Sequence, residues 1–152
     1  MYEEKLAEMG ITIQSPPVPL AAYVPSLKVG DFVFTSGQLP IVDGVLKYTG
    51  KVSADISLEE AQDAAKICAI NCLNAVKSVA GDLDNIEQIV KVTAFVNSPA
   101  GFTDQPKVAN GASEFLQNVF DEVGKHTRAA VGVNELPLNA AVEIEMIVKL
   151  KK

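Results

Sequence analysis

Apolar and polar residues alternate along the last segment of the chain in the pattern of a half-buried strand. From Val142 to Leu150 every second residue is apolar, and Glu143 and Glu145 lie between them. Successive side chains of a strand point to opposite faces of a sheet. One face of this strand is therefore expected to pack on a core, and the other to carry two carboxylates together with Ile147.

Two longer segments place their apolar residues at helical spacing. The first begins at Ser57, which can cap the helix while Glu60 reaches back to it in a capping box, and Gly81 is expected to end it. The second spans about Asp104 to Val123 and is closed by Gly124. A shorter helix is predicted near the N-terminus.

Apolar runs bounded by turn residues predict the remaining strands, and a hairpin turn is expected at Asp43-Gly44. The predicted strands are Ala21 to Lys28, Phe32 to Ser36, Ile89 to Asn97, Arg128 to Val133 and Val142 to Leu150.

The chain of 152 residues is predicted to form a single domain over residues 1–152. Residues 1–19 would comprise a helix from Tyr2 to Met9 and a proline-rich connector, and residues 20–150 the core. Two long helices can cover only one face of a sheet of this size, which predicts a two-layer α+β domain. Because the uncovered face carries apolar residues such as Ile147, another copy of the sheet is expected to cover it.

The overall charge narrows the choice of partners. A net charge of −6 argues against nucleic acid, whose binding depends on clustered Lys and Arg, and such a cluster occurs only in residues 149–152. The chain has no apolar run of about 20 residues that would span a membrane, and no apolar signal core at its start. We therefore expect a cytoplasmic protein that does not bind membranes.

Few side chains could carry chemistry. Cys68 and Cys72 are four residues apart, which is neither a redox nor a metal spacing, so both are expected to be reduced core residues, and no metal site is predicted. His126 is the single histidine, and no Ser or Asp lies at a spacing that supports a catalytic triad. It is interpreted as a loop residue.

Arg128 precedes Glu143 and Glu145 by fifteen and seventeen residues in a predicted strand–turn–strand. A guanidinium can bind a carboxylate through two parallel hydrogen bonds, although a surface ion pair with one of these acids is an alternative. Glu143 could accept a proton from water, or could be no more than a solvated acid.

Two sequence blocks extend this pattern. Thr35-Ser-Gly-Gln-Leu-Pro40 and Arg128…Leu136-Pro137…Val142-Glu-Ile-Glu145 resemble the signature blocks of the Rid family, the reactive intermediate deaminases, also called YjgF-like. Tyr23, thirteen residues before Ser36, and Asn110 in the second long helix also fit the family's pattern.

The resemblance implies a chorismate-mutase-like fold with a mixed sheet and a homotrimer with an inner β-barrel, whose sites lie in clefts between subunits. It implies hydrolysis of small 2-imino acids and their enamines to 2-keto acids and ammonia, without a metal or organic cofactor. Carried over residue by residue, it assigns catalytic roles to Arg128, Glu143 and Tyr23, and substrate binding to Ser36, Gly37, Ala130 and Asn110. It leaves Glu145 as a structural acid.

Two departures from the family's pattern indicate a divergent subgroup. Ala130 stands where the family usually has a cysteine, and Ala21-Ala22 where it has Gly-Pro. The missing cysteine leaves open a second hypothesis, in which the cleft binds a small carboxylate and regulates without turnover. A third, endoribonuclease or translation-inhibitor activity, is disfavoured by the acidic charge.

Overall fold

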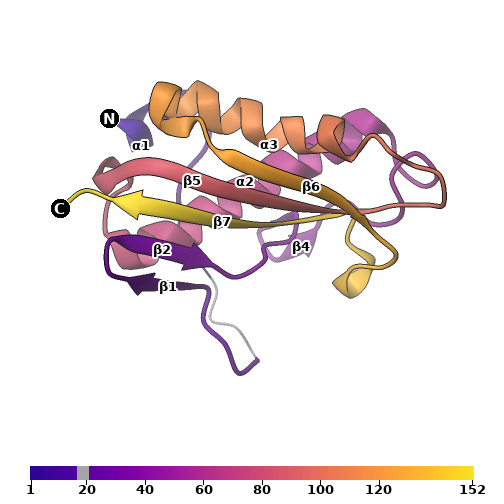
Figure 1. The fold of residues 1–152 in the computed structure, drawn as a ribbon, viewed down its shortest axis with the longest axis horizontal. Helices are drawn as coiled ribbons and strands as arrows, with labels where there is room; N and C mark the ends of the chain where they lie inside the picture. The colour runs from indigo at the N-terminus through magenta and orange to yellow at the C-terminus, as the bar shows by residue number, and fades with distance from the viewer. Residues whose placement is uncertain (17–20) are drawn as a thin grey trace.

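The computed structural model describes residues 1–16 and 21–152 as a five-stranded mixed sheet covered on one face by helices (Figure 1). The strand order is β1-β2-β7-β5-β6, and β5 and β6 are its one parallel pair. The strands are β1 (Ser26–Val29), β2 (Phe32–Thr35), β5 (Ile86–Asn97), β6 (Thr127–Val133) and β7 (Val142–Leu150). The predicted α+β class is confirmed. The predicted hairpin at Asp43-Gly44 joins β3 (Ile41–Val42) to β4 (Val45–Leu46).

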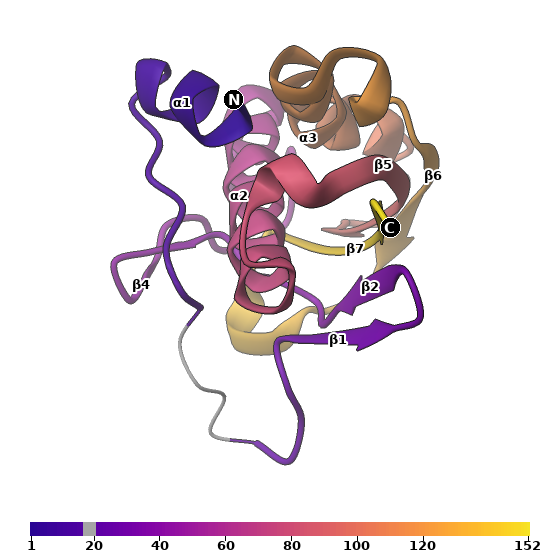
Figure 2. The same cartoon turned by 90° about the vertical axis from the view of Figure 1, so that its left-hand side faces the viewer.

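Helices α2 (Leu58–Ala80) and α3 (Gln105–Phe120) lie on the same face of the sheet (Figure 2). The capping box of α2 is present, with reciprocal hydrogen bonds of 3.1 Å between Ser57 and Glu60. Helix α3 ends at Phe120, earlier than predicted, because Asp121 has a positive φ of 51° and a 3₁₀ turn, η2 (Asp121–Gly124), follows. In the described part of the chain, no helix is both long and apolar enough to cross a membrane.

Helix α1 (Tyr2–Glu8) confirms the predicted N-terminal helix and packs on the rest of the domain. The Tyr2 ring centroid lies 4.5 Å from that of Phe120, and the Tyr2 backbone N–H donates to Asp84 at 2.8 Å. Of the predicted proline-rich connector, residues 17–19 lie outside the described residues.

The first predicted strand is wrong in its N-terminal half. Residues 21–23 form a bend, and β1 begins only at Ser26. Pro25 has no N–H with which to join a sheet, which places it before the strand rather than within it. Two short 3₁₀ turns, η1 (Leu83–Asn85) and η3 (Pro137–Asn139), occur in segments for which no element was predicted.

The predicted faces of β7 are confirmed. Its residues with even numbers are buried beneath the helices, whereas Glu143, Glu145 and Ile147 lie on the opposite, open face. Exposed apolar side chains from neighbouring strands share this open face. They are Leu27, Val29, Phe32, Phe34 and Val131. The second copy expected to cover this face, and hence the trimer and its barrel, stay predictions.

Candidate functional site

Arg128 lies on edge strand β6 and points to the helix side of the sheet. It pairs with Val92, which in turn pairs with Met146, and both of these are buried beneath the helices. Side chains opposite one another on paired strands share a face. The guanidinium reaches α3, where Nη1 donates to Asn110 Oδ1 at 2.8 Å and to Ser113 Oγ at 3.2 Å. The structure thus brings together two predicted site residues, Arg128 and Asn110.

The positive charge of Arg128 has no carboxylate partner among the described residues. The alternative of an ion pair with Glu143 or Glu145 is therefore wrong within one chain. Arginine has five N–H donors in a planar fork, and in the described part of the chain only those of Nη1 are used. The Nη2–Nε edge remains for a planar acid to bind through two hydrogen bonds.

Sequence reasoning missed the groups behind this arginine. Ser113 Oγ lies 2.9 Å from His126 Nε2, and His126 Nδ1 lies 2.6 Å from the Gly124 carbonyl oxygen. His126 lies in a loop as predicted, but it does have a serine partner, thirteen residues away on α3. A backbone carbonyl occupies the place that a carboxylate would take in a triad, so the arrangement is not a Ser-His-Asp site. Ala130, two residues along β6, adds only a methyl group. We call Arg128, Asn110, Ser113, His126 and Ala130 the Arg128 cluster.

Glu143 lies against Gly37, which explains the glycine at that position. A Cβ atom on Gly37 would lie 2.8 Å from Glu143 Cδ and 2.9 Å from its Oε2. Backbone hydrogen bonds of 2.7 and 3.0 Å between Gln38 and Ile144 hold the two segments together. Glu143 is half-buried, and this desolvation, with a smaller contribution from the neighbouring Glu145 charge, raises the pKa of its carboxyl above the ordinary value of 4.5.

Ser36 precedes Gly37 in the chain, and its hydrogen bonds reach the segment that follows Tyr23. The Ser36 hydroxyl donates to the Val24 carbonyl at 2.6 Å, and the Ser36 N–H donates to the Pro25 carbonyl at 2.8 Å. These bonds fix the bend that carries Tyr23. Tyr23 is exposed and lines, together with Gly37, a hollow of about 470 Å³ between the residue 14–16 segment, α2 and the β3–β4 hairpin. We call Glu143, Gly37, Ser36 and Tyr23 the Glu143 cluster.

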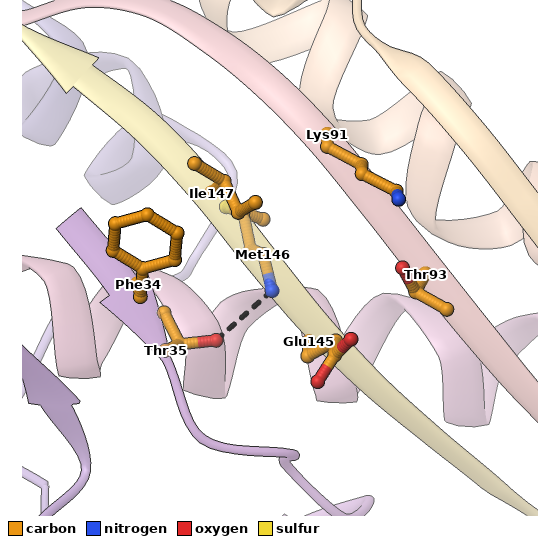
Figure 3. Close-up of a pocket in the computed structure, with 7 residues that line it drawn as sticks. All are labelled: Phe34, Thr35, Lys91, Thr93, Glu145, Met146 and Ile147. Atoms are coloured by element: carbon orange, nitrogen blue, oxygen red, sulfur yellow. Dashed lines mark hydrogen bonds between the residues drawn. The ribbon is translucent and has the colours of Figure 1, made fainter. Parts of the chain in front are cut away.

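Glu145 lies elsewhere on the same open face. Figure 3 shows it on β7 beside Thr93 of β5, in a shallow hollow of about 110 Å³ that Lys91 also lines. The Met146 N–H donates to Thr35 Oγ1 at 3.0 Å and holds β2 to β7 here. Glu145 is therefore a matched acid on the same strand face as Glu143, outside the Glu143 cluster.

The two cysteines are free and buried, as predicted. The Cys68 thiol donates to the Val142 carbonyl at 3.6 Å and the Cys72 thiol to the Ile144 carbonyl at 3.4 Å. Burial raises the pKa of Cys68 well above its ordinary value and that of Cys72 to about 12. Neither thiol is available as a nucleophile. Among the described residues, no group of three or more His, Cys, Asp or Glu side chains could hold a metal ion.

The Arg128 and Glu143 clusters do not meet within one protomer. Arg128 shares a row with Val92 on the helix side, and Glu143 pairs with Phe95 on the open side. These rows are three residues apart along β5, about 10 Å, and β6 and β7 are two strand spacings apart, about another 10 Å. The sheet itself separates the two side chains.

Comparison with known proteins agrees with this architecture. The family described as "YjgF/chorismate_mutase-like, putative endoribonuclease" matches residues 3–150. Protein TCP17 of Trypanosoma cruzi is 41% identical over 146 residues, which cover 95% of this chain and 91% of that protein. A 2-iminobutanoate/2-iminopropanoate deaminase of Dermatophagoides farinae is 33% identical over 135 residues, 89% of this chain and 91% of that protein.

Among solved structures, the protein Atu1372 from Agrobacterium tumefaciens is 42% identical. It superposes with a TM-score of 0.89 over 99% of this chain and 93% of that one. The resemblance to the reactive intermediate deaminases is thus confirmed by sequence: the chain belongs to the YjgF/chorismate mutase-like family.

Proposed function

We propose that the protein hydrolyses small 2-imino acids and their enamine tautomers to 2-keto acids and ammonia, at sites formed between two copies of the chain. The observation that carries this proposal is the Arg128 guanidinium, which has no carboxylate partner among the described residues and keeps its Nη2–Nε edge free. An anionic substrate supplies the missing charge. The name of the deaminase from Dermatophagoides farinae supports 2-iminobutanoate and 2-iminopropanoate as the substrate class.

In the proposed reaction, Arg128 binds the substrate carboxylate and so fixes the position of the imine carbon. Glu143 takes a proton from a water molecule while the water oxygen bonds to the imine carbon. It then gives that proton to the imine nitrogen. Glu143 then takes the hydroxyl proton of the resulting carbinolamine and delivers it to the amino nitrogen, so that the C–N bond breaks, ammonia leaves and the carbonyl forms. The raised pKa of Glu143 suits a group that must both accept and donate a proton, because it holds a proton more readily than an ordinary carboxylate. Asn110, Tyr23, Ser36 and Gly37 would line the cleft.

Two copies are required because the sheet separates the two clusters of one protomer. In a closed ring, each interface brings unlike surfaces together, so the Arg128 cluster of one protomer can face the Glu143 cluster of the next. The exposed apolar side chains of the open face, including Phe34 and Val131, support burial of that face between copies.

The test is subunit complementation. Arg128→Ala and Glu143→Gln chains, each expected to keep only a small residual activity alone, are coexpressed with different tags, and the mixed assemblies are isolated by both tags. Decay of 2-iminopropanoate generated in situ is then followed. A trimeric ring containing both variants has one interface with both residues intact, so it should regain about one third of wild-type activity. No recovery would place both residues in one protomer's site, or in different sites, and refute the proposal. The matched control is the same coexpression with Glu145→Gln as the second variant chain. Unlike Glu143→Gln, the Glu145→Gln chain should be active alone.

Ala130 favours a second candidate function, the capture of a small carboxylate without turnover. No thiol or hydroxyl occupies this position to take part in chemistry. Stabilisation of the wild-type protein by 2-oxobutanoate, with no decay of the imine above the uncatalysed rate, would favour this alternative. Endoribonuclease activity, which the family's description includes, finds no support in a chain of net charge −6.

A further inference from the structure

The Arg128 guanidinium is supported by a serine that is almost completely buried. Ser113 is 7% exposed and lies on α3, one helical turn from Asn110. Its hydroxyl oxygen accepts a hydrogen bond from Arg128 Nη1 at 3.2 Å. A hydroxyl group has one hydrogen to donate. If that hydrogen is donated to another group, the lone pairs of the Ser113 oxygen are left to accept from Arg128.

The direction follows from the histidine. A carbonyl oxygen can only accept, so the contact of 2.6 Å between His126 Nδ1 and the Gly124 oxygen places the ring hydrogen on Nδ1. In the neutral ring Nε2 then carries a lone pair, and the Ser113 hydroxyl donates to it at 2.9 Å. Burial, and to a smaller extent the Arg128 charge, lower the pKa of His126 below its ordinary value of 6.5 and keep the ring neutral.

The chain of hydrogen bonds ends in backbone that is tightly packed. A Cβ atom on Gly124 would lie 2.4 Å from the Leu116 carbonyl oxygen of α3, so residue 124 is held close against that helix. The hydrogen bonds run from Arg128 to Ser113, His126 and Gly124, and each donor strengthens the next in such a series. Asn110 fixes the second hydrogen of Nη1 from the same helix.

We propose that Ser113 and His126 are positioning residues, which hold the Arg128 guanidinium with its Nη2–Nε edge turned toward the bound carboxylate. This inference rests on the proposed function, in which Arg128 binds the substrate. An arginine at an exposed strand edge would otherwise be distributed over many rotamers and would lose that freedom on binding. Ser113 and His126 reduce this entropic cost by ordering the Arg128 side chain before the carboxylate binds.

The test measures binding of 2-oxobutanoate, a keto acid product, by calorimetry. Ser113→Ala removes the link between Arg128 and His126 and should weaken binding about tenfold, the effect of one hydrogen bond to a charged group. Ser113→Thr keeps the hydroxyl and should bind within about threefold of wild type. Ser78→Ala, which removes a hydroxyl bonded to the Ala75 carbonyl of α2 at 2.7 Å, is the matched control and should bind as wild type.

A second measurement uses the wild-type protein and does not depend on a variant that folds. His126 is the only histidine, so its ring nitrogens give one set of signals in a ¹⁵N-labelled sample. We expect the Nδ1–H tautomer, with Nε2 as acceptor, and a shift of these signals when 2-oxobutanoate binds. The Nε2–H tautomer, or a ring that titrates near the ordinary pKa of 6.5, would overturn the inference.

The outcomes separate the two proposals. Wild-type affinity in Arg128→Ala would refute the proposed role of the arginine, and this inference with it. Wild-type affinity in Ser113→Ala, beside weakened binding in Arg128→Ala, would refute the inference alone. Equal losses in Ser113→Ala and Ser113→Thr would assign the effect to packing and would also refute it.

Discussion

Replacing Gly37 with alanine tests whether the position of the Glu143 carboxyl determines the rate. The new Cβ would lie 2.8 Å from Glu143 Cδ, and ordinary contact begins at 3.4 Å, so the carboxyl must move by about 0.6 Å. Because a misplacement of 1 Å can cost about 10²-fold in rate, we expect kcat/KM to fall by roughly 10- to 100-fold.

Stability should change little in the same variant. Gly37 does not have a positive φ, so alanine can adopt its backbone conformation, and the clash falls on the end of a flexible side chain. The smaller conformational freedom of alanine in the unfolded chain also offsets part of the cost. We expect the free energy of unfolding to remain within about 1 kcal/mol of wild type. A loss of activity without a loss of stability distinguishes displacement of the carboxyl from general damage.

The assay is imine decay in a double-mutant cycle. If Gly37→Ala acts through the Glu143 carboxylate, it should change kcat/KM by less than about threefold when introduced into Glu143→Gln. Equal effects in the two backgrounds would show that Gly37 acts independently of Glu143. That result, or wild-type activity in Gly37→Ala, would refute the reasoning.

Three further predictions concern stability, pH and thiol access. Gly111→Ala should lower the melting temperature, because its Cβ would lie 2.1 Å from the Gln62 carbonyl oxygen of α2. The overpacking should cost about 1–3 kcal/mol and exceed the gain in helix propensity of about 1 kcal/mol. A melting temperature at or above that of wild type would contradict this prediction. The pKa of Glu143 is raised in the folded protein. Its ionised carboxylate therefore lowers the free energy of unfolding at a pH above that raised pKa, and this cost is absent at a pH below the ordinary value of 4.5. Glu143→Gln should therefore melt higher than wild type near neutral pH and lose this advantage in acid. Wild-type activity should fall as the pH drops through the raised pKa, and the small residual activity of Glu143→Gln should not show this fall. Cys68 and Cys72 should react with a thiol reagent only after unfolding, and rapid labelling of the native protein would show the assigned burial to be wrong.

The elements governed by local patterns could be predicted from the sequence. The alternation from Val142 to Leu150 gave both faces of β7, because a half-buried strand has a period of two. The capping residues of α2 gave its first turn. Pro25 was the local signal that could have corrected the first strand, since proline cannot donate to a ladder.

The candidate site could be predicted only in part, because its contacts join distant segments. Arg128 and Glu143 come from neighbouring parts of the sequence, but the pairing of β6 with β5 and of β5 with β7 decides that they lie on opposite faces. The contact between Ser113 and His126 depends on how the end of α3 and η2 pack against β6. A search for triad spacing misses a partner fixed only by tertiary packing.

The contacts of the two buried thiols match the repeat of a helix to the repeat of a strand. Four residues of a helix rise about 6 Å, and two residues of a strand advance about 6.6 Å. Cys68 and Cys72 can therefore donate together to the Val142 and Ile144 carbonyls, which belong to the residues before and after Glu143. Because these two distances are nearly equal, a shift of α2 along β7 would break both thiol–carbonyl contacts together. The two buried thiols thus set the position of α2 along β7, the strand that carries Glu143 on its opposite face.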